Sequence, residues 1–199
     1  ANRYPYITCE MGVGNQITYH RRPNIGKQDG PSMTICRLGG GAVMVGYYVF
    51  HGGTHPVGDG ITTEESLLNN TGFTHLIYPH LNYDFMASIS EYGYIRPSYW
   101  LMKMQFQFLR KWGEKLAEMI PVWPNKKFLP KNGSDMEKLR ITVRINKEGN
   151  GFLFYNNFSR YFSSNRFNSV ELSILLPENR IFKQKQLKIP SDSNYHLNI

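Results

Sequence analysis

An almost unbroken apolar run, AVMVGYYVF at residues 42–50, is the strongest structural signal in this sequence. Such a run is typical of a strand that is covered on both faces in a parallel sheet. It follows a segment with helical spacing, Pro31–Leu38, which has Asp29 near its start and three glycines after its end. A short β-rich run, Tyr4–Glu10, precedes that helix. The order strand, helix, strand predicts a βαβ unit.

The chain changes character after about Lys126. Before this point, Pro97–Leu116 carries apolar residues at helical intervals and predicts an amphipathic helix. Pro121–Gly133 is rich in proline and lysine, which is typical of a linker. Later segments alternate apolar and polar residues and predict antiparallel strands, with a turn at Pro177–Arg180; these segments are Leu139–Ile145, Gly151–Asn156 and Val170–Leu176.

We therefore expect three parts along the chain. Residues 1–120 form an α/β part, residues 121–135 a linker, and residues 136–199 a β-rich domain of β-sandwich type. The predicted fold class is α/β followed by all-β.

The net charge of +8 is carried almost entirely by the second half of the chain. Residues 1–110 hold eight Lys and Arg against seven Asp and Glu, whereas residues 111–199 hold fifteen against eight. These basic residues are dispersed along strand-like segments and form no continuous run or nucleic-acid motif. We expect a solvated basic face and no nucleic-acid partner, with an acidic polysaccharide or anionic surface as the alternative.

Several kinds of site are not expected from the composition. No run approaches the roughly 18 apolar residues of a membrane helix, so no membrane partner is expected. The six histidines have no ligand-like spacing and predict no metal site. Cys9 and Cys36 form neither a disulfide framework nor a zinc site, and we expect two small buried thiols.

Glu10 is the first candidate for catalysis. It closes an apolar strand and precedes a glycine-containing loop, and barrel enzymes present catalytic groups at the carboxyl ends of their strands. A glutamate at a strand end is, however, often a capping or surface residue. From its position alone, both a catalytic role and a capping or surface role are open for Glu10.

Three loop segments also attract attention. His51 stands before Gly52-Gly53, where the backbone can approach a ligand closely, although a tight turn explains the two glycines equally well. Tyr19 opens a polar loop that continues with His20, Arg21 and Arg22. Aromatic and carboxylate residues gather in Asn82–Phe85 and Glu91–Gly93, which suits sugar recognition because rings stack on C–H surfaces and carboxylates accept hydroxyl hydrogens.

Six stretches, in a consistent order along almost the whole chain, resemble glycoside hydrolase family 35, the β-galactosidases. They are YPYITCEMGVG (4–14), YHRRP (19–23), GYYVFHGGTHPVG (46–58), NYDFMASISEYG (82–93), GFLFYNNFSRY (151–161) and LKIPSDSNY near the C-terminus. The resemblance implies a partial (β/α)₈ TIM barrel joined to an antiparallel β-rich domain. Strand seven of the barrel would end at Glu10, strand eight would be residues 42–50, and the helix Pro97–Leu116 would close the barrel.

The resemblance also implies roles for single residues. Glu10 matches the nucleophile that attacks the anomeric carbon, and Tyr48 matches a tyrosine that lines the galactose site. Tyr83-Asp84-Phe85 matches a loop whose tyrosine contacts the sugar or the nucleophile, but Phe85 stands at that position and lacks the hydroxyl. His55 stands where many members have Asn.

The expected substrate is a β-galactoside or a galactose-containing oligosaccharide, and glycoside hydrolysis needs no cofactor or metal. The residues expected to contact this substrate are Tyr19, Tyr48, His51, Tyr83 and Phe85. The resemblance further favours a periplasmic or secreted bacterial protein.

Retaining hydrolysis needs two carboxyl groups about 5 to 5.5 Å apart. In the family the acid/base is a Glu that directly follows an Asn, and this chain has no Asn-Glu dipeptide before the expected end of the barrel. We therefore expect a fragment that is inactive alone and needs the N-terminal part of the barrel. The alternative is a catalytically incomplete carbohydrate-binding or assembly fragment whose basic β-rich half contacts an anionic glycan.

Overall fold

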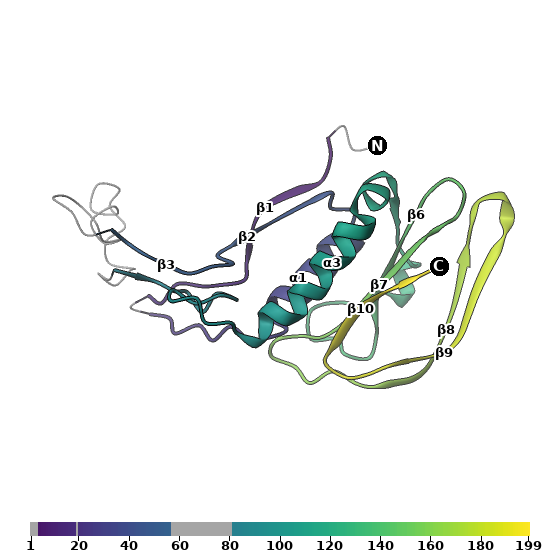
Figure 1. The fold of residues 1–199 in the computed structure, drawn as a ribbon. Coiled ribbons are helices and arrows are strands. Elements are labelled where there is room, and N and C mark those ends of the chain that lie inside the picture. The colour runs from purple at the N-terminus through teal and green to yellow at the C-terminus, as the bar shows by residue number, and fades with distance from the viewer. Residues whose placement is uncertain (1–3, 19, 57–80) are drawn as a thin grey trace. The chain divides into compact units, whose positions relative to one another are not determined.

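The computed structural model describes residues 4–18, 20–56 and 81–199 (Figure 1). Their helices and strands, in chain order, are β1 (Ile7–Gly12), α1 (Asp29–Gly39), β2 (Met44–Tyr48), β3 (Gly53–Thr54), β4 (Asn82–Tyr83), α3 (Pro97–Glu118), β5 (Ile120–Val122), η2 (Lys126–Phe128), β6 (Arg140–Ile145), β7 (Gly151–Asn157), β8 (Phe167–Leu175), η3 (Pro177–Asn179), β9 (Ile181–Ile189) and β10 (Ser193–Asn198). Helix and sheet are mixed and strands predominate, as expected. The strands of the described residues form small open sheets and no closed barrel.

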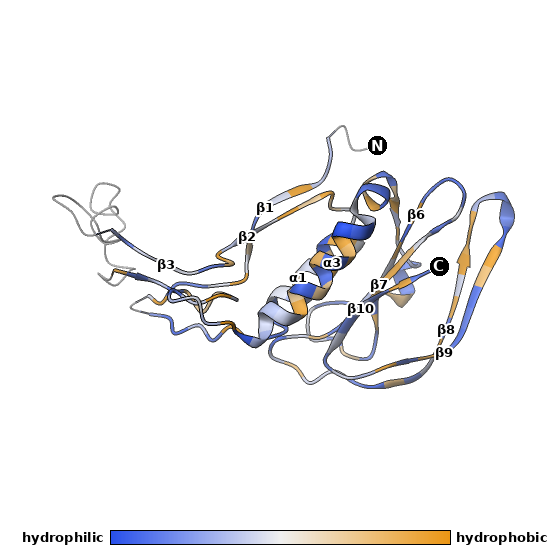
Figure 2. Ribbon diagram, in the orientation of Figure 1, coloured by the Kyte–Doolittle hydropathy of each residue, from blue (hydrophilic) through white to orange (hydrophobic). Residues whose placement is uncertain are grey.

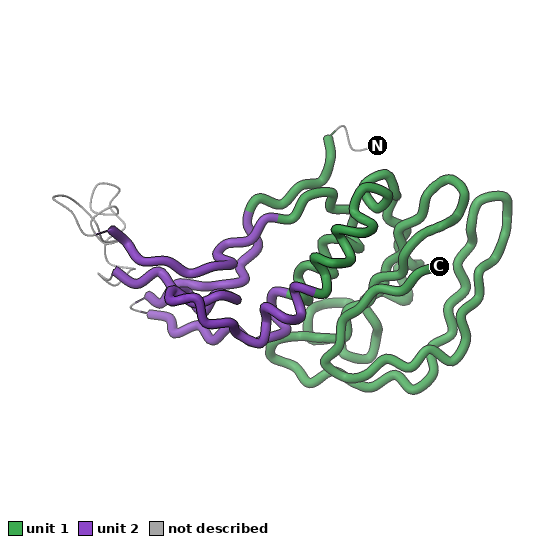
Figure 3. Tube along the Cα trace, viewed as in Figure 1, with its two compact units in different colours: residues 1–9, 31–45, 104–199 green, residues 10–30, 46–103 purple. Residues whose placement is uncertain are grey.

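The chain divides into two compact units (Figure 3). Unit 1 comprises residues 1–9, 31–45 and 104–199, and unit 2 comprises residues 10–30 and 46–103. This division differs from the one expected from sequence, because most of α1 and the second half of α3 belong with the C-terminal strands. The reason is a shared apolar core in unit 1.

The predicted strand–helix–strand order is confirmed by β1, α1 and β2. Strands β1 and β2 pair in a two-stranded sheet. The Val43 N–H donates to the Tyr6 carbonyl over 2.9 Å, and the Thr8 hydroxyl donates to the Met44 carbonyl over 3.3 Å. From the first contact to the second, the residue numbers increase in both segments, as they do between parallel strands.

Strand β2 is shorter and more exposed than its apolar sequence predicts. It covers five residues; Met44, its first residue, is 46% exposed, and Val43 just before it is 40% exposed. The expectation of a strand covered on both faces is therefore wrong for the described residues. The physical reason is that β2 has a single strand neighbour among them.

Helix α1 begins two residues before the predicted start and ends one residue after the predicted end. The Asp29 carboxylate accepts the Gly26 N–H at 2.7 Å, which fixes the entry into the helix. At the other end, Gly41 adopts φ +102° while its N–H donates to the Leu38 carbonyl. A side chain at this φ would be strained, so glycine ends the helix here as predicted.

Helix α3 confirms the second predicted helix and extends it to Glu118. Apolar and polar residues alternate along it (Figure 2). Phe108 and Leu116 are buried, whereas Arg110 and Lys111 are exposed. The helical spacing of the sequence therefore does mark the face that packs in unit 1.

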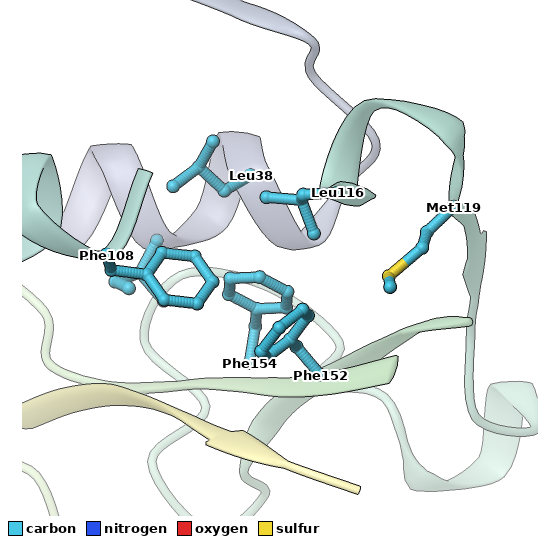
Figure 4. Packing of buried hydrophobic residues seen from close by; sticks show 7 residues of the cluster. Leu38, Phe108, Leu116, Met119, Phe152 and Phe154 are labelled. Atoms are coloured by element: carbon cyan, nitrogen blue, oxygen red, sulfur yellow. The ribbon is translucent and has the colours of Figure 1, made fainter. Parts of the chain in front are cut away.

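The main sheet of unit 1 has the order β10-β7-β6-β5, with antiparallel pairing throughout. Every residue of β7 is buried, because both faces of this central strand are covered. On one face, Phe152 and Phe154 point toward Leu38 of α1 and Leu116 of α3 (Figure 4). The opposite face carries Leu153, which packs with residues of β6 and of the β8–β9 hairpin.

The segment expected to be a linker contains regular structure. Strand β5 pairs with β6 at the edge of the main sheet, with Pro121 opposite Arg144, and η2 follows it. A proline lacks the N–H that a central strand needs, but it is tolerated in an edge strand, where its nitrogen can face away from the ladder. Strands β6, β7 and β8 lie where the alternating sequence predicts them, whereas β9 and β10 were not foreseen.

Arg144 is a buried cation that joins the sheet to both helices of unit 1. It is 1% exposed, and its guanidinium donates to the carbonyls of Leu38 and Ala42, at the end of α1, and of Leu116 and Met119, at the end of α3. Burial lowers the pKa of Arg144 to about 10, so it stays protonated at neutral pH. The carbonyl ends of two helices, which carry partial negative charge, stabilise that cation.

Both cysteines are free and exposed, so the expectation of buried thiols is wrong. Cys9 lies in β1 and Cys36 in α1, the element types predicted for them.

Candidate functional site

Glu10 lies inside β1 in unit 2 and is exposed. The strand continues through Met11 to Gly12, so Glu10 does not close it as expected. Because side chains alternate along a strand, Glu10 and Met11 point to opposite faces, and Met11 is 3% exposed. The Glu10 carboxylate is therefore accessible to solvent, while the Met11 side chain packs inside the protein.

An aromatic cluster made of Tyr48, Tyr83 and Phe85 lies close enough to this carboxylate for the Glu10 charge to act on Tyr83. Tyr83 stacks on Phe85 with ring centroids 4.1 Å apart, and Tyr48 meets both rings edge-on at 6.1 and 6.2 Å. The pKa of Tyr83 is raised, first by burial and then by the negative charge of Glu10. The structure therefore brings together Glu10 and three of the residues expected to contact substrate.

His55 is a further neighbour of the aromatic cluster. Its ring meets Tyr83 edge-on at 5.1 Å, and its Nε2 is buried without a hydrogen-bond partner among the described residues. The sequence showed His55 only as a departure from the family pattern. Its contact with Tyr83 depends on the antiparallel pairing of β3 with β4, which places Thr54 opposite Asn82.

Asp84 holds the backbone that carries the aromatic cluster. Its carboxylate pairs with Arg96 at 2.7 Å and accepts the N–H groups of Glu91 at 2.7 Å and Met86 at 3.1 Å. Burial alone would raise the pKa of Asp84, but these hydrogen bonds and the Arg96 charge outweigh it and hold the pKa below its usual value. Asp84 is thus a supporting carboxylate, and Arg96 is a partner that the sequence did not single out.

Glu91 is also engaged in support. Its carboxylate accepts hydrogen bonds from the Thr54 hydroxyl and the Asn82 amide, which ties together β3 and β4. The acidic residues in the loop segments therefore hold the local backbone in place, while the aromatic residues form the cluster.

Two backbone features position Phe85. It adopts φ +51°, and its carbonyl accepts the Asn15 N–H at 2.7 Å. A Cβ placed on Gly52 would lie 2.8 Å from both the Asp84 Cα and the Glu91 N, so only glycine fits there. The close approach expected at Gly52-Gly53 is real at Gly52, and its neighbour there is another segment of the chain.

The aromatic cluster does not include the candidates His51 and Tyr19. His51 is exposed, its Nδ1 lies against the Gly52 carbonyl, and its backbone bridges to Ile89. It makes no ring contact with the aromatic cluster among the described residues. Tyr19 lies outside the described residues.

Metal and membrane sites are not evident where the structure is described. Residues 4–18, 20–56 and 81–199 hold no group of three or more His, Cys, Asp or Glu side chains arranged to bind a metal ion. No helix in the same ranges is long and apolar enough to cross a membrane.

Comparisons with known proteins give no family. No family model matches the chain. A search of curated proteins finds no match either.

Proposed function

We propose that this chain comprises the C-terminal part of the catalytic barrel and the start of the β-rich domain of a retaining β-galactosidase of glycoside hydrolase family 35, with Glu10 as the nucleophile. The observation that carries the proposal is the exposed Glu10 carboxylate beside the aromatic cluster of Tyr48, Tyr83 and Phe85. Aromatic faces stack on the C–H surface of a sugar, and a nearby carboxylate can attack its anomeric carbon.

The other carboxylates of unit 2 support this choice. Asp29 bonds the Gly26 N–H, Asp84 pairs with Arg96, and Glu91 accepts bonds from Thr54 and Asn82. Among the described carboxylates of this unit, Glu10 alone receives no hydrogen bond from a described residue. An uncommitted carboxylate is what a nucleophile requires, because its lone pair must reach the substrate.

The same comparison bears on the acid/base. That group must exchange a proton with the glycosidic oxygen and later with water. Asp84 and Glu91 are held by several donors, and the pKa of Asp84 lies below its usual value, which suits a permanent anion. We therefore place the acid/base outside the described part of this chain.

The exposed apolar surface of β1 and β2 fits an incomplete barrel. Ile7 of β1 is 49% exposed, Met44 of β2 is 46% exposed, and the pair has no further strand among the described residues. Apolar strands with open edges are normally covered in stable proteins. In this proposal the remaining strands of the barrel cover them.

The direct test is Glu10→Gln in the completed barrel, meaning this chain together with the segment that supplies the remaining strands. Hydrolysis of 4-nitrophenyl β-D-galactopyranoside should fall by about a thousandfold or more, because amide oxygen is a poor nucleophile. Glu118→Gln, at the exposed end of α3, is the matched control and should retain full activity. Activity retained in the Glu10 variant would refute the assignment.

A second candidate function is attachment to an anionic glycan through β9. Lys183, Lys185 and Lys188 are exposed on this strand, and no carboxylate lies within ion-pair distance of them among the described residues. Substituting all three lysines by glutamine should abolish retention on heparin at low ionic strength, while lysine-to-arginine substitutions should preserve it. Equal retention of both variants would rule this function out.

A further inference from the structure

Unit 1 contains a cavity of about 370 Å³ that the proposed glycosidase does not use. It lies between α1, the face of β6 and β7 that packs against the helices, and the segment 129–133. This volume falls within the range of small-molecule sites, about 300–1,000 Å³. The cavity therefore has room for one small organic ligand.

The cavity wall is mainly apolar. Ile35 of α1, Phe154 of β7 and Trp123 contribute to it, and Leu129 and Pro130 extend the apolar surface. Trp123 is 55% exposed, so its ring is accessible. Such a wall favours a ligand with an aromatic or short aliphatic body.

The amide side chains on the wall are largely committed to the fold. Asn156 donates to the Cys36 Sγ and the Phe158 carbonyl, and its Oδ1 accepts the Phe158 N–H. The Oδ1 of Asn132 accepts from the N–H and hydroxyl of Ser134 and from the Asp135 N–H. These amides are poorly placed to pair with the many hydroxyls of a sugar, which disfavours a second saccharide site.

Arg140 supplies the only formal charge on the described wall. Its Nη2 donates to the backbone carbonyls of Asn132, Gly133 and Asp135, which fixes the guanidinium at the cavity. No carboxylate lies within ion-pair distance of it in the described part of the chain. A fixed guanidinium without an anionic partner is suited to bind a carboxylate.

The environment of the Cys36 thiol is consistent with Arg140 lying at the cavity. Burial raises the pKa of its thiol, while the Asn156 hydrogen bond and the Arg140 charge oppose the shift. Protein atoms surround much of the residue, but Cys36 lies on the cavity wall and retains solvent-accessible surface. Cys36 can therefore report on whether the cavity is filled.

We propose that this cavity binds a small aryl carboxylate, with its ring against the apolar wall at Ile35, Phe154 and Trp123 and its carboxylate on Arg140. The site is independent of the proposed glycosidase, because it uses none of the residues around Glu10. Binding is reversible and involves no covalent step.

The test uses the full chain with Cys9→Ser, which leaves Cys36 as the single thiol. Naphthalene-2-carboxylate and its neutral isostere naphthalene-2-carboxamide are compared for their ability to slow the maleimide reaction of Cys36. We expect the carboxylate to protect Cys36 at concentrations about tenfold lower than the amide, the difference that one charge-assisted hydrogen bond gives.

Arg140→Gln should remove the preference for the carboxylate and leave protection by the amide unchanged. Arg166→Gln, at an exposed arginine of the same unit, is the matched control and should keep the preference. Equal protection by the two probes, protection by neither at millimolar concentration, or protection by galactose instead would overturn the proposal. The comparison of the two probes needs no change at Arg140, so it remains decisive if Arg140→Gln fails to fold.

Discussion

Single residues carry the functional argument in unit 2, and Tyr83 is the most informative of them. Its phenol is partly buried, stacked on Phe85 and subject to the charge of Glu10. A tyrosine hydroxyl is protonated at neutral pH, and the raised pKa of Tyr83 extends this to higher pH, so it can donate a hydrogen bond either to a carboxylate or to a sugar. Phe85 lacks a hydroxyl, which leaves Tyr83 as the phenolic donor of the stacked pair.

Replacing Glu10 by Gln should lower the pKa of Tyr83. The substitution removes a negative charge that disfavours the phenolate, while burial, the larger cause, continues to hold the pKa above its ordinary value. NMR titration of a chain with ¹³Cζ-labelled tyrosine, with the Tyr83 signal assigned from Tyr83→Phe, measures the shift. An unchanged pKa would show that Glu10 does not face Tyr83.

At the scale of elements, the adjacent glycines Gly52 and Gly53 differ in how closely other parts of the chain approach them. Gly52 is pressed against the backbone of Asp84 and Glu91, whereas a Cβ on Gly53 would meet nothing within 4 Å. The sequence shows the pair as equivalent. The difference arises from segments that lie more than 30 residues further along the chain.

Gly52→Ala should destabilise unit 2 by about 1–3 kcal/mol, because the added methyl group must displace backbone. It should also displace Phe85 and weaken the influence of Glu10 on Tyr83. Gly53→Ala is the matched control and should change stability by less than about 0.5 kcal/mol. Denaturant unfolding of the two variants provides the comparison, and equal stability would contradict the close approach at Gly52.

In unit 1, Arg144 is the residue whose buried contacts hold the elements together. Arg144→Met should destabilise the unit by about 3 kcal/mol or more, since it leaves the buried carbonyls of Leu38, Ala42, Leu116 and Met119 without their donor. Arg166→Met, at an exposed site, should leave stability nearly unchanged. Thermal unfolding followed by circular dichroism measures both, and similar melting temperatures would mean that the guanidinium is dispensable.

Across the whole molecule, the sequence predicts the elements better than it predicts their surroundings. The apolar spacing of Pro97–Leu116 identifies α3, and Asp29 and Gly41 mark the two ends of α1, because these signals are local. Alternation along β6 suggests that Arg140, Thr142 and Arg144 face solvent. The structure turns that face toward the helices, and the partners of Arg144 lie up to 106 residues away.

In the candidate site, too, the sequence identifies residues but not their contacts. Glu10, Tyr48, Tyr83 and Phe85 were identified through their place in the resembling stretches, and the structure gathers them in unit 2. Arg96 and His55 were not assigned to the site, because their roles depend on contacts with Asp84 and Tyr83. A single sequence shows the type of residue at each position but does not show which residues are already paired.

The central claim, that Glu10 is the nucleophile, is tested most directly by covalent labelling. The completed barrel is treated with 2-deoxy-2-fluoro-β-D-galactopyranosyl fluoride, whose fluoride leaves without the help of an acid and whose second fluorine slows release of the glycosyl-enzyme. Peptide mapping by mass spectrometry should locate one fluorogalactosyl group on Glu10. A label on Asp84, on Glu91 or on any other residue would contradict the claim.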